Sequence, residues 1–133
     1  MKVDTAGQER FRALGSAFWR DSNACLLVFD VTSAHSFTNL TKWKIDFFEM
    51  ASISAEGLVD FPFILVGNKW DLADRRVVSR ERALEWCHEY NINGKDIQYV
   101  ETSAKEDYNV DRVFQVRYLS IKSTNLILIL SIL

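Results

Sequence analysis

A short apolar run in this chain ends abruptly in three polar side chains, Asn68, Lys69 and Asp71, which offer an amide, an amine and a carboxylate. The run, residues 63–67, shows no polar alternation, which is typical of a strand covered on both faces in a parallel sheet. Parallel sheets bind ligands just beyond the carboxyl ends of their strands. The sequence therefore predicts a ligand-binding site at these three residues.

A second polar cluster follows another predicted strand, residues 97–100. It runs from Glu101 to Lys105 and includes Ser103 and Ala104. One such motif is weak evidence, whereas two motifs at the ends of two strands, in this order, are strong. If the two strand ends are neighbours, the clusters form a single site.

Together the two clusters have the chemistry to distinguish guanine from adenine. The Asp71 carboxylate can accept both the N1–H and the N2–H donors of guanine as a bidentate pair. Adenine would turn its N1 lone pair toward Asp71 and leave a buried charge unsatisfied. The backbone N–H of Ala104 could meet guanine O6, and the alkyl stems of Lys69 and Lys105 could cover the two ring faces. We predict a guanine-reading site with Asp71 as its deciding residue.

A third polar motif lies near the start of the chain and contains Asp4, Gly7 and Gln8. Gly7 allows unusual backbone angles and close approach to a ligand. The same residues are equally consistent with a polar surface loop that happens to contain glycine, since a short motif is a hypothesis until its context confirms it. The residues alone leave both interpretations open.

The elements that position these motifs alternate along the chain. Strands are predicted at residues 24–30, 63–67 and 97–100, and each is followed by an amphipathic helix. Ser33 or Ser36 is expected to cap the first helix, and Ser79 the second. Such alternation implies parallel crossovers and an open sheet with helices on both faces, which is an α/β fold.

The length and composition limit the number of domains and the kinds of partner that the chain can have. A chain of 133 residues with 48% hydrophobic residues supports one domain. A net charge of -2 with mixed signs makes nucleic acid an unexpected partner. Cys25 and Cys87 are expected to be buried free thiols in a reducing compartment, and His35 and His88 surface residues without a metal role. The apolar tract at residues 126–133 is too short to span a membrane, so a cytoplasmic protein is expected.

The three polar motifs resemble those of the Ras-like small GTPases, over about residues 3–115. Residues 4–9 resemble the switch II segment of that family, and the two later clusters resemble its guanine-reading motifs. Residues 4–11, 18–20 and 27–32 resemble the Rab branch. Residues 61–63, 86–87 and 103–110 look most like its late-endosomal and vacuolar members. The resemblance implies a partial P-loop NTPase (Ras-like) fold, a three-layer α/β/α arrangement with a mostly parallel sheet.

The resemblance also implies an activity, in which the protein hydrolyses GTP to GDP and acts as a switch in vesicle and endosomal traffic. It further implies a role for each matching residue. Asp4 would hold Mg²⁺ through a water, the Gly7 N–H would meet the γ-phosphate of GTP, and Gln8 would orient the attacking water. Rab effectors and regulators would bind the segment between Arg10 and Arg20. The base would be read by Asn68, Lys69, Asp71, Ser103, Ala104 and Lys105, with Ser103 supporting Asp71.

The chain also departs from the family pattern. No Gly-x-x-x-x-Gly-Lys-Ser/Thr motif occurs, so we expect the first strand, phosphate loop and switch I to precede Met1. The strand at residues 24–30 would then present an unpaired edge. Residues 1–122 would form a partial GTPase domain, and residues 123–133 an apolar, aggregation-prone tail. The last cysteine is Cys87, so no prenyl anchor is expected on the endosomal or vacuolar surface that the family occupies.

Three interpretations remain open on the sequence. In the first interpretation, the chain is a truncated Rab-type GTPase that binds nucleotide poorly. The backbone nest for the phosphates is missing, and this nest and magnesium supply most of the nucleotide affinity in such sites. Alternatively, it is a non-hydrolysing fragment that presents switch II to partners. The third interpretation is an incomplete gene model.

Overall fold

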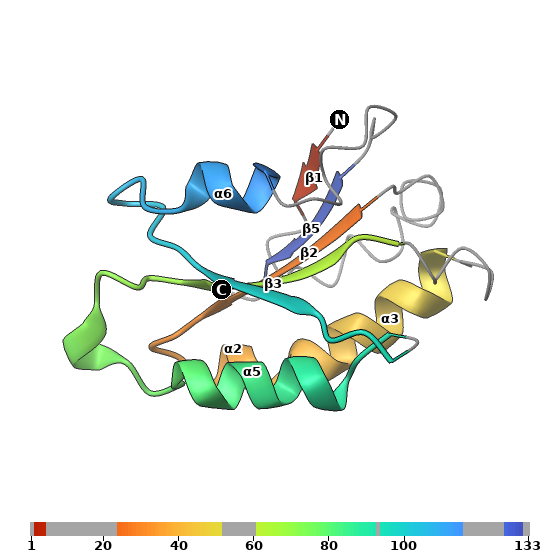
Figure 1. Cartoon of the computed structure of the whole chain (residues 1–133), viewed down its shortest axis with the longest axis horizontal. Helices are drawn as coiled ribbons and strands as arrows, with labels where there is room; N and C mark the ends of the chain where they lie inside the picture. The colour runs from red at the N-terminus through yellow and green to blue at the C-terminus, as the bar shows by residue number, and fades with distance from the viewer. Residues whose placement is uncertain (1, 5–23, 52–60, 93, 116–126, 132–133) are drawn as a thin grey trace.

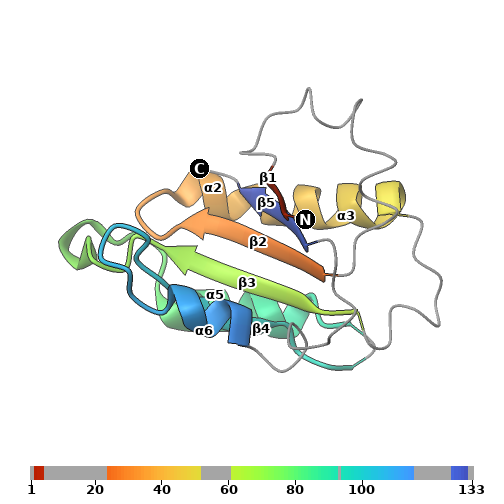
Figure 2. The ribbon, with the colours of Figure 1, turned by 90° about the horizontal axis from the view of Figure 1, so that it is seen from above.

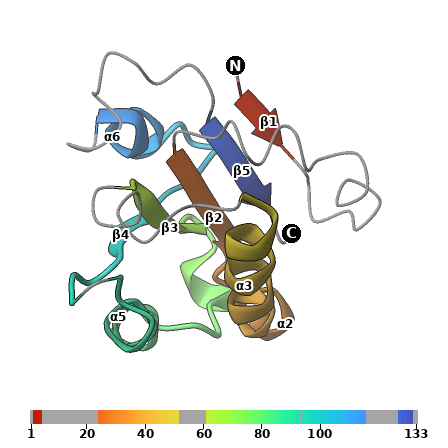
Figure 3. The same ribbon diagram turned by 90° about the vertical axis from the view of Figure 1, so that its right-hand side faces the viewer.

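The described residues of the computed structural model, 2–4, 24–51, 61–92, 94–115 and 127–131, form a parallel sheet with helices on both faces (Figure 1). The strand order is β1-β5-β2-β3-β4, and every pairing between these strands is parallel. Helix α6 covers one face, whereas α2, α3 and α5 cover the other (Figure 3). The predicted three-layer α/β arrangement is confirmed.

The three predicted strands begin and end within a residue of the predicted positions, as β2 (Ala24–Asp30), β3 (Phe63–Asn68) and β4 (Gln98–Glu101). Two further strands, β1 (Lys2–Asp4) and β5 (Ile127–Ser131), belong to the same sheet. Figure 2 shows β2 and β3 side by side and pointing the same way. In this register Asp30 lies opposite Asn68, and Gly67 lies opposite Glu101. The polar residues that follow these strands therefore meet at one end of the sheet.

The helices are short and two of them are capped as predicted. They are α2 (Ala34–Thr38), α3 (Leu40–Ala51), the 3-10 turn η1 (Ala73–Arg75), α5 (Arg80–Glu89) and α6 (Val110–Gln115). The Ser33 hydroxyl accepts from Ser36 N at 3.2 Å, and the Ser79 hydroxyl accepts from Arg82 N at 3.1 Å. The first predicted helix is divided at Asn39 into α2 and α3. Among the described helices none is long and apolar enough to cross a membrane.

The aromatic stripe of α2 and α3 packs against the sheet, as its spacing predicts. Phe37, Trp43 and Phe47 are buried in one cluster with Leu27 and Leu65 of the central strands. On the other face, a smaller apolar cluster joins β2, β3 and β4 to α6. Cys25 and Cys87 are both buried and free, which confirms the prediction for the thiols.

The prediction that β2 has an unpaired edge is wrong. Strand β5, from the apolar tract near the end of the chain, lies between β1 and β2 and pairs with both. Cys25 of β2 lies opposite Leu128, and Val3 of β1 lies opposite the same residue. Backbone N–H and C=O groups in a buried strand need partners, and β5 supplies them to both neighbours. Residues 127–131 of this tract thus form a strand inside the sheet.

Candidate nucleotide-binding site

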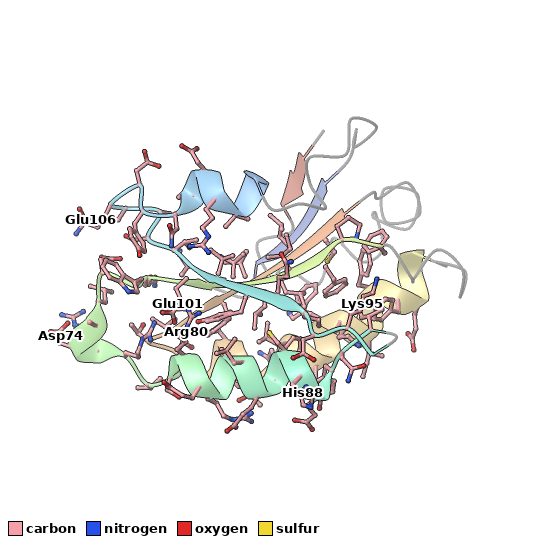
Figure 4. All side chains as sticks on the ribbon, in the orientation of Figure 1. Asp74, Arg80, His88, Lys95, Glu101 and Glu106 are labelled. Atoms are coloured by element: carbon pink, nitrogen blue, oxygen red, sulfur yellow. The ribbon has the colours of Figure 1, made fainter. Side chains whose placement is uncertain are left out.

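Strands β3 and β4 bring the two polar clusters together at one end of the sheet. The two strands are parallel neighbours, and the Thr102 N–H donates to Gly67 O at 2.8 Å just beyond their paired residues. Figure 4 shows Asp74, in the segment that follows β3, and Glu106, in the segment that follows β4, at the same end of the molecule. The two clusters therefore form one site, as the sequence predicts.

Asn68 ties the two clusters to each other. Its Oδ1 atom accepts from Ala104 N at 3.1 Å and from the Thr102 hydroxyl at 3.2 Å. A further bond runs from Trp70 N to Thr102 O at 3.0 Å. Since both side-chain bonds use Oδ1, the amide NH₂ group of Asn68 is turned away from these donors. An amide NH₂ group can donate two hydrogen bonds to other acceptors.

Asp71 is held by Ser103 from the second cluster. The buried Ser103 hydroxyl donates to Asp71 Oδ1 at 2.7 Å and accepts from Glu106 N at 3.0 Å. The Asp71 side chain itself is only partly buried. A carboxylate fixed through one oxygen keeps lone pairs on both oxygens for a ligand with two donors. The structure thus brings together the two residues that the resemblance pairs.

Lys69 forms an ion pair that the sequence reasoning missed. Its Nζ atom lies 2.7 Å from Oδ2 of Asp30, while Oδ1 of Asp30 accepts from Thr32 N at 2.8 Å and from the Thr32 hydroxyl at 2.6 Å. Burial alone would raise the pKa of Asp30, but Lys69 and Thr32 outweigh it and hold that pKa below its usual range. The sequence indicated only that Asp30, like Asn68, stands at the end of a predicted strand.

The backbone of Ala104 makes a hydrogen bond within the site, whereas Lys105 is exposed. Ala104 N, which we expected to meet guanine O6, donates to Asn68 Oδ1 instead. Ala104 therefore contributes to the site by fixing the Asn68 amide. Lys105 lies exposed on the same loop, where its alkyl stem could still cover one face of a ring.

Three residues in the site loops adopt left-handed backbone conformations. Their φ angles are 67° at Lys69, 52° at Asp107 and 59° at Asn109. A non-glycine residue in this region costs about 1–2 kcal/mol. Asn109 Nδ2 donates to Glu101 O at 3.0 Å, and the rings of Trp70 and Tyr108 stack between the two loops. Sequence reasoning missed this stack, because nothing in the spacing of the two residues indicates it.

Gly67, just before Asn68, leaves room for Tyr99 of the neighbouring strand. A Cβ atom at residue 67 would collide with the Tyr99 hydroxyl. That hydroxyl donates to Glu101 Oε2 at 2.7 Å, and Glu101 also pairs with Arg76. Burial, and next the bond to Glu101, raise the pKa of Tyr99, so it stays a neutral donor. The close approach of these groups explains why glycine stands at residue 67.

A cavity of about 150 Å³ lies beside the two clusters, between the sheet and α6. Three residues of the site, Asn68, Thr102 and Ala104, form part of its lining. The remaining lining is aliphatic and comes from Leu26, Val28, Val66, Val110 and Val113. The two polar clusters thus lie next to a space with a mostly apolar lining.

The remaining predicted site residues are not placed by the structure. Gly7, Gln8 and the segment between Arg10 and Arg20 lie outside the described residues. Asp4 ends β1, but its side chain is not described. Their roles toward phosphate, Mg²⁺ and partners stay predictions.

The polar clusters at the ends of β3 and β4, on a parallel sheet with helices on both faces, are arranged as the resemblance to the small GTPases predicts. The sequence model of the Ras family matches residues 2–123, so the chain belongs to the Ras family. This match confirms the family resemblance and the Ras-like fold.

Within the family, the chain is similar to Rab proteins. It is 51% identical over 113 residues to Rab7 of Drosophila melanogaster, a match that covers 85% of this chain and 51% of the relative. It is 50% identical over 113 residues to RABG3b of Arabidopsis thaliana, covering 84% and 53% respectively. Rab-7a of Dictyostelium discoideum is 46% identical over 112 residues, covering 84% and 52%. The resemblance to the Rab7-type, late-endosomal branch is confirmed, and the chain spans about half the length of these relatives.

Proposed function

We propose that the site formed by residues 68–71 and 102–105 binds the guanine base of GDP or GTP. One observation carries this proposal: Ser103 holds Asp71 at 2.7 Å while Ala104 and Thr102 hold Asn68. A carboxylate acceptor and an amide donor are thereby held in place by hydrogen bonds within the protein. Such pre-organisation lowers the cost of ordering these groups when a ligand binds.

The fixed groups match the edge of guanine. The Asp71 carboxylate accepts from N1–H and N2–H, and the Asn68 amide NH₂ donates to an acceptor on the five-membered ring. Adenine lacks the donor pair, so Asp71 would face a lone pair and remain unsatisfied. The exposed stems of Lys69 and Lys105 provide apolar surface for the ring faces.

We further propose that the site serves a GTP-hydrolysing switch in vesicle traffic, which membership of the Ras family and the similarity to Rab proteins support. In this proposal Gly7 and Gln8 face the γ-phosphate and the attacking water, and Asp4 supports Mg²⁺ through a water. Effectors and regulators bind between Arg10 and Arg20, on the surface of late-endosomal or vacuolar membranes. Magnesium supplies charge neutralisation at the phosphates when it is bound.

The 133 residues alone are proposed to bind nucleotide weakly. They contain no Gly-x-x-x-x-Gly-Lys-Ser/Thr segment, and the backbone nest and lysine of that motif hold the phosphates of a nucleotide. The same sequence observation favours a second candidate function, in which the chain presents the segment between Arg10 and Arg20 to Rab partners without hydrolysing GTP. Capture of a Rab effector by the chain in the absence of nucleotide would support this second function.

Calorimetric titration of the full chain tests the proposal. We expect GDP and guanosine to bind weakly, ADP and adenosine to bind at least tenfold more weakly still, and Mg²⁺ to change these affinities little. Equal affinity for guanine and adenine ligands would contradict base recognition. Tight, magnesium-dependent binding of GTP would instead contradict the proposed deficiency.

A further inference from the structure

Trp70 and Tyr108 form a stacked aromatic pair across the two loops of the site. Their ring centroids are 4.3 Å apart and the ring planes differ by 18°. Both residues remain substantially exposed, 43% for Trp70 and 39% for Tyr108. Two large rings that are left this exposed contribute little to the core. Their contact instead connects the loop after β3 to the loop after β4.

The backbone beside both rings is left-handed. Lys69 immediately precedes Trp70, and Asp107 and Asn109 flank Tyr108. Within the described part of the chain these three are the only non-glycine residues with positive φ. Side-chain sterics disfavour this conformation, so it persists only where surrounding contacts hold it. The stacked pair is such a contact, and it acts on both loops at once.

Short hydrogen bonds connect the pair to the base-reading atoms. Tyr108 and Ser103 exchange two backbone bonds of 3.1 and 2.9 Å, and the Ser103 hydroxyl donates to Asp71 at 2.7 Å. On the other loop, Trp70 lies directly between Lys69 and Asp71 and donates its N–H to Thr102 O at 3.0 Å. A displacement of either ring would therefore move the Asp71 carboxylate.

We propose that Trp70 and Tyr108 form an aromatic clasp that positions Asp71 and Asn68 to read the guanine base. The inference deepens the proposed function and rests on it. Both aromatic residues are positioning residues, because they act through Ser103 and the backbone. The alternative is that the stack contributes only to general stability.

Hydrogen exchange on the nucleotide-free full chain separates these roles. The informative amide is Ala104, which donates to Asn68 Oδ1, and the amide of Leu65 in the core serves as reference. We expect several-fold faster exchange at Ala104 in Trp70→Ala and in Tyr108→Ala, no further increase in the double variant, and unchanged exchange at Leu65. Trp70→Phe should retain the slow exchange, because it keeps a ring that can stack.

A matched control is Leu84→Ala on α5, a residue with a similar exposure of 42% that lies away from these loops. It should leave Ala104 exchange unchanged. Unchanged exchange at Ala104 in the aromatic variants, additive increases in the double variant, or equal acceleration at Leu65 would each overturn the clasp.

Titration with GDP then tests base positioning. Trp70→Ala should raise the Kd for GDP about three- to tenfold and reduce the preference over ADP, whereas Trp70→Phe should resemble the parent chain. An unchanged Kd in Trp70→Ala overturns the positioning role. If the parent chain shows no preference for GDP over ADP while the exchange pattern is as expected, the proposed function and the base-positioning role are both wrong.

Discussion

The Asp71 side chain can only accept hydrogen bonds, and Ser103 fixes its orientation. Its proposed role in reading guanine can be tested by a substitution that turns one of its acceptors into a donor. Asp71→Asn replaces one acceptor by an NH₂ donor. Xanthine has an N1–H donor beside a C2 carbonyl acceptor. It therefore matches the amide of the Asp71→Asn variant, whereas guanine matches the carboxylate of the parent chain. We expect the preference to shift from GDP to xanthosine diphosphate by about tenfold or more, since an unmatched buried polar group costs about 1–3 kcal/mol.

Competition binding of the two diphosphates measures this shift. Asp74→Asn, an equivalent change on the exposed η1 turn, is the control and should leave the preference unaltered. Retention of the GDP preference in Asp71→Asn would show that another residue reads the base.

The Asp30–Lys69 ion pair predicts an acid-dependent contribution to stability. The pKa of Asp30 is lower in the folded chain than in the unfolded one, so the ionised carboxylate stabilises the fold above the unfolded pKa. That contribution is lost as the pH falls through the folded pKa. Asp30→Asn should therefore lower the free energy of unfolding by about 2 kcal/mol at pH 7, by loss of bonds to a charged group.

Urea unfolding at pH 7 and near pH 3 measures the effect. The difference between the parent chain and Asp30→Asn should shrink at the lower pH, while Thr32→Val should lower stability and leave Lys69 paired. A difference that is the same at both pH values would show that the Asp30 charge is not what stabilises the fold.

At the scale of single residues, the sequence predicted the polar clusters but not all of their partners. Asn68, Asp71 and Ser103 could be identified because the sequence itself shows their residue types and their positions at the ends of predicted strands. The contacts of Asp30 with Lys69 and of Trp70 with Tyr108 depend on which loops become neighbours in space. The bond from Ala104 to Asn68 likewise depends on loop geometry, which residue order does not specify.

At the scale of elements, periodicity and caps predicted the helices and the central strands. Ser33 and Ser79 begin α2 and α5 as their side chains suggest, and the buried runs of β2 and β3 begin and end within a residue or two of the prediction. The place of β5 could not be predicted, because an apolar tract shows that it will be buried but not between which strands. The order of strands is a long-range property.

The place of β5 in the sheet can be tested with the thiols. Burial raises the pKa of Cys25 well above its usual value and that of Cys87 to about 12, so neither should react quickly in the folded chain. Leu128→Pro removes an N–H from β5 opposite Cys25 and should weaken the pairing of β5 in the sheet. We expect Cys25 to become labelled faster than Cys87.

Mass spectrometry after timed labelling distinguishes the two thiols within one sample. Leu128→Val keeps the N–H and the preference for a strand, so labelling should stay slow at both cysteines. Equal labelling of Cys25 and Cys87 in Leu128→Pro would show that β5 does not protect β2 selectively.

On the scale of the whole molecule, the position of β5 bears on how the chain folds. Its pairing places Lys2 opposite Ile127, so strands from the two ends of the sequence are direct neighbours. Folding slows as contacts become more distant in sequence, because a long loop must close before such a pair forms. A ribosome would release β1 and β2 long before β5 emerges. These two strands can join one sheet only after β5 has been synthesised, so this part of the sheet is expected to form late.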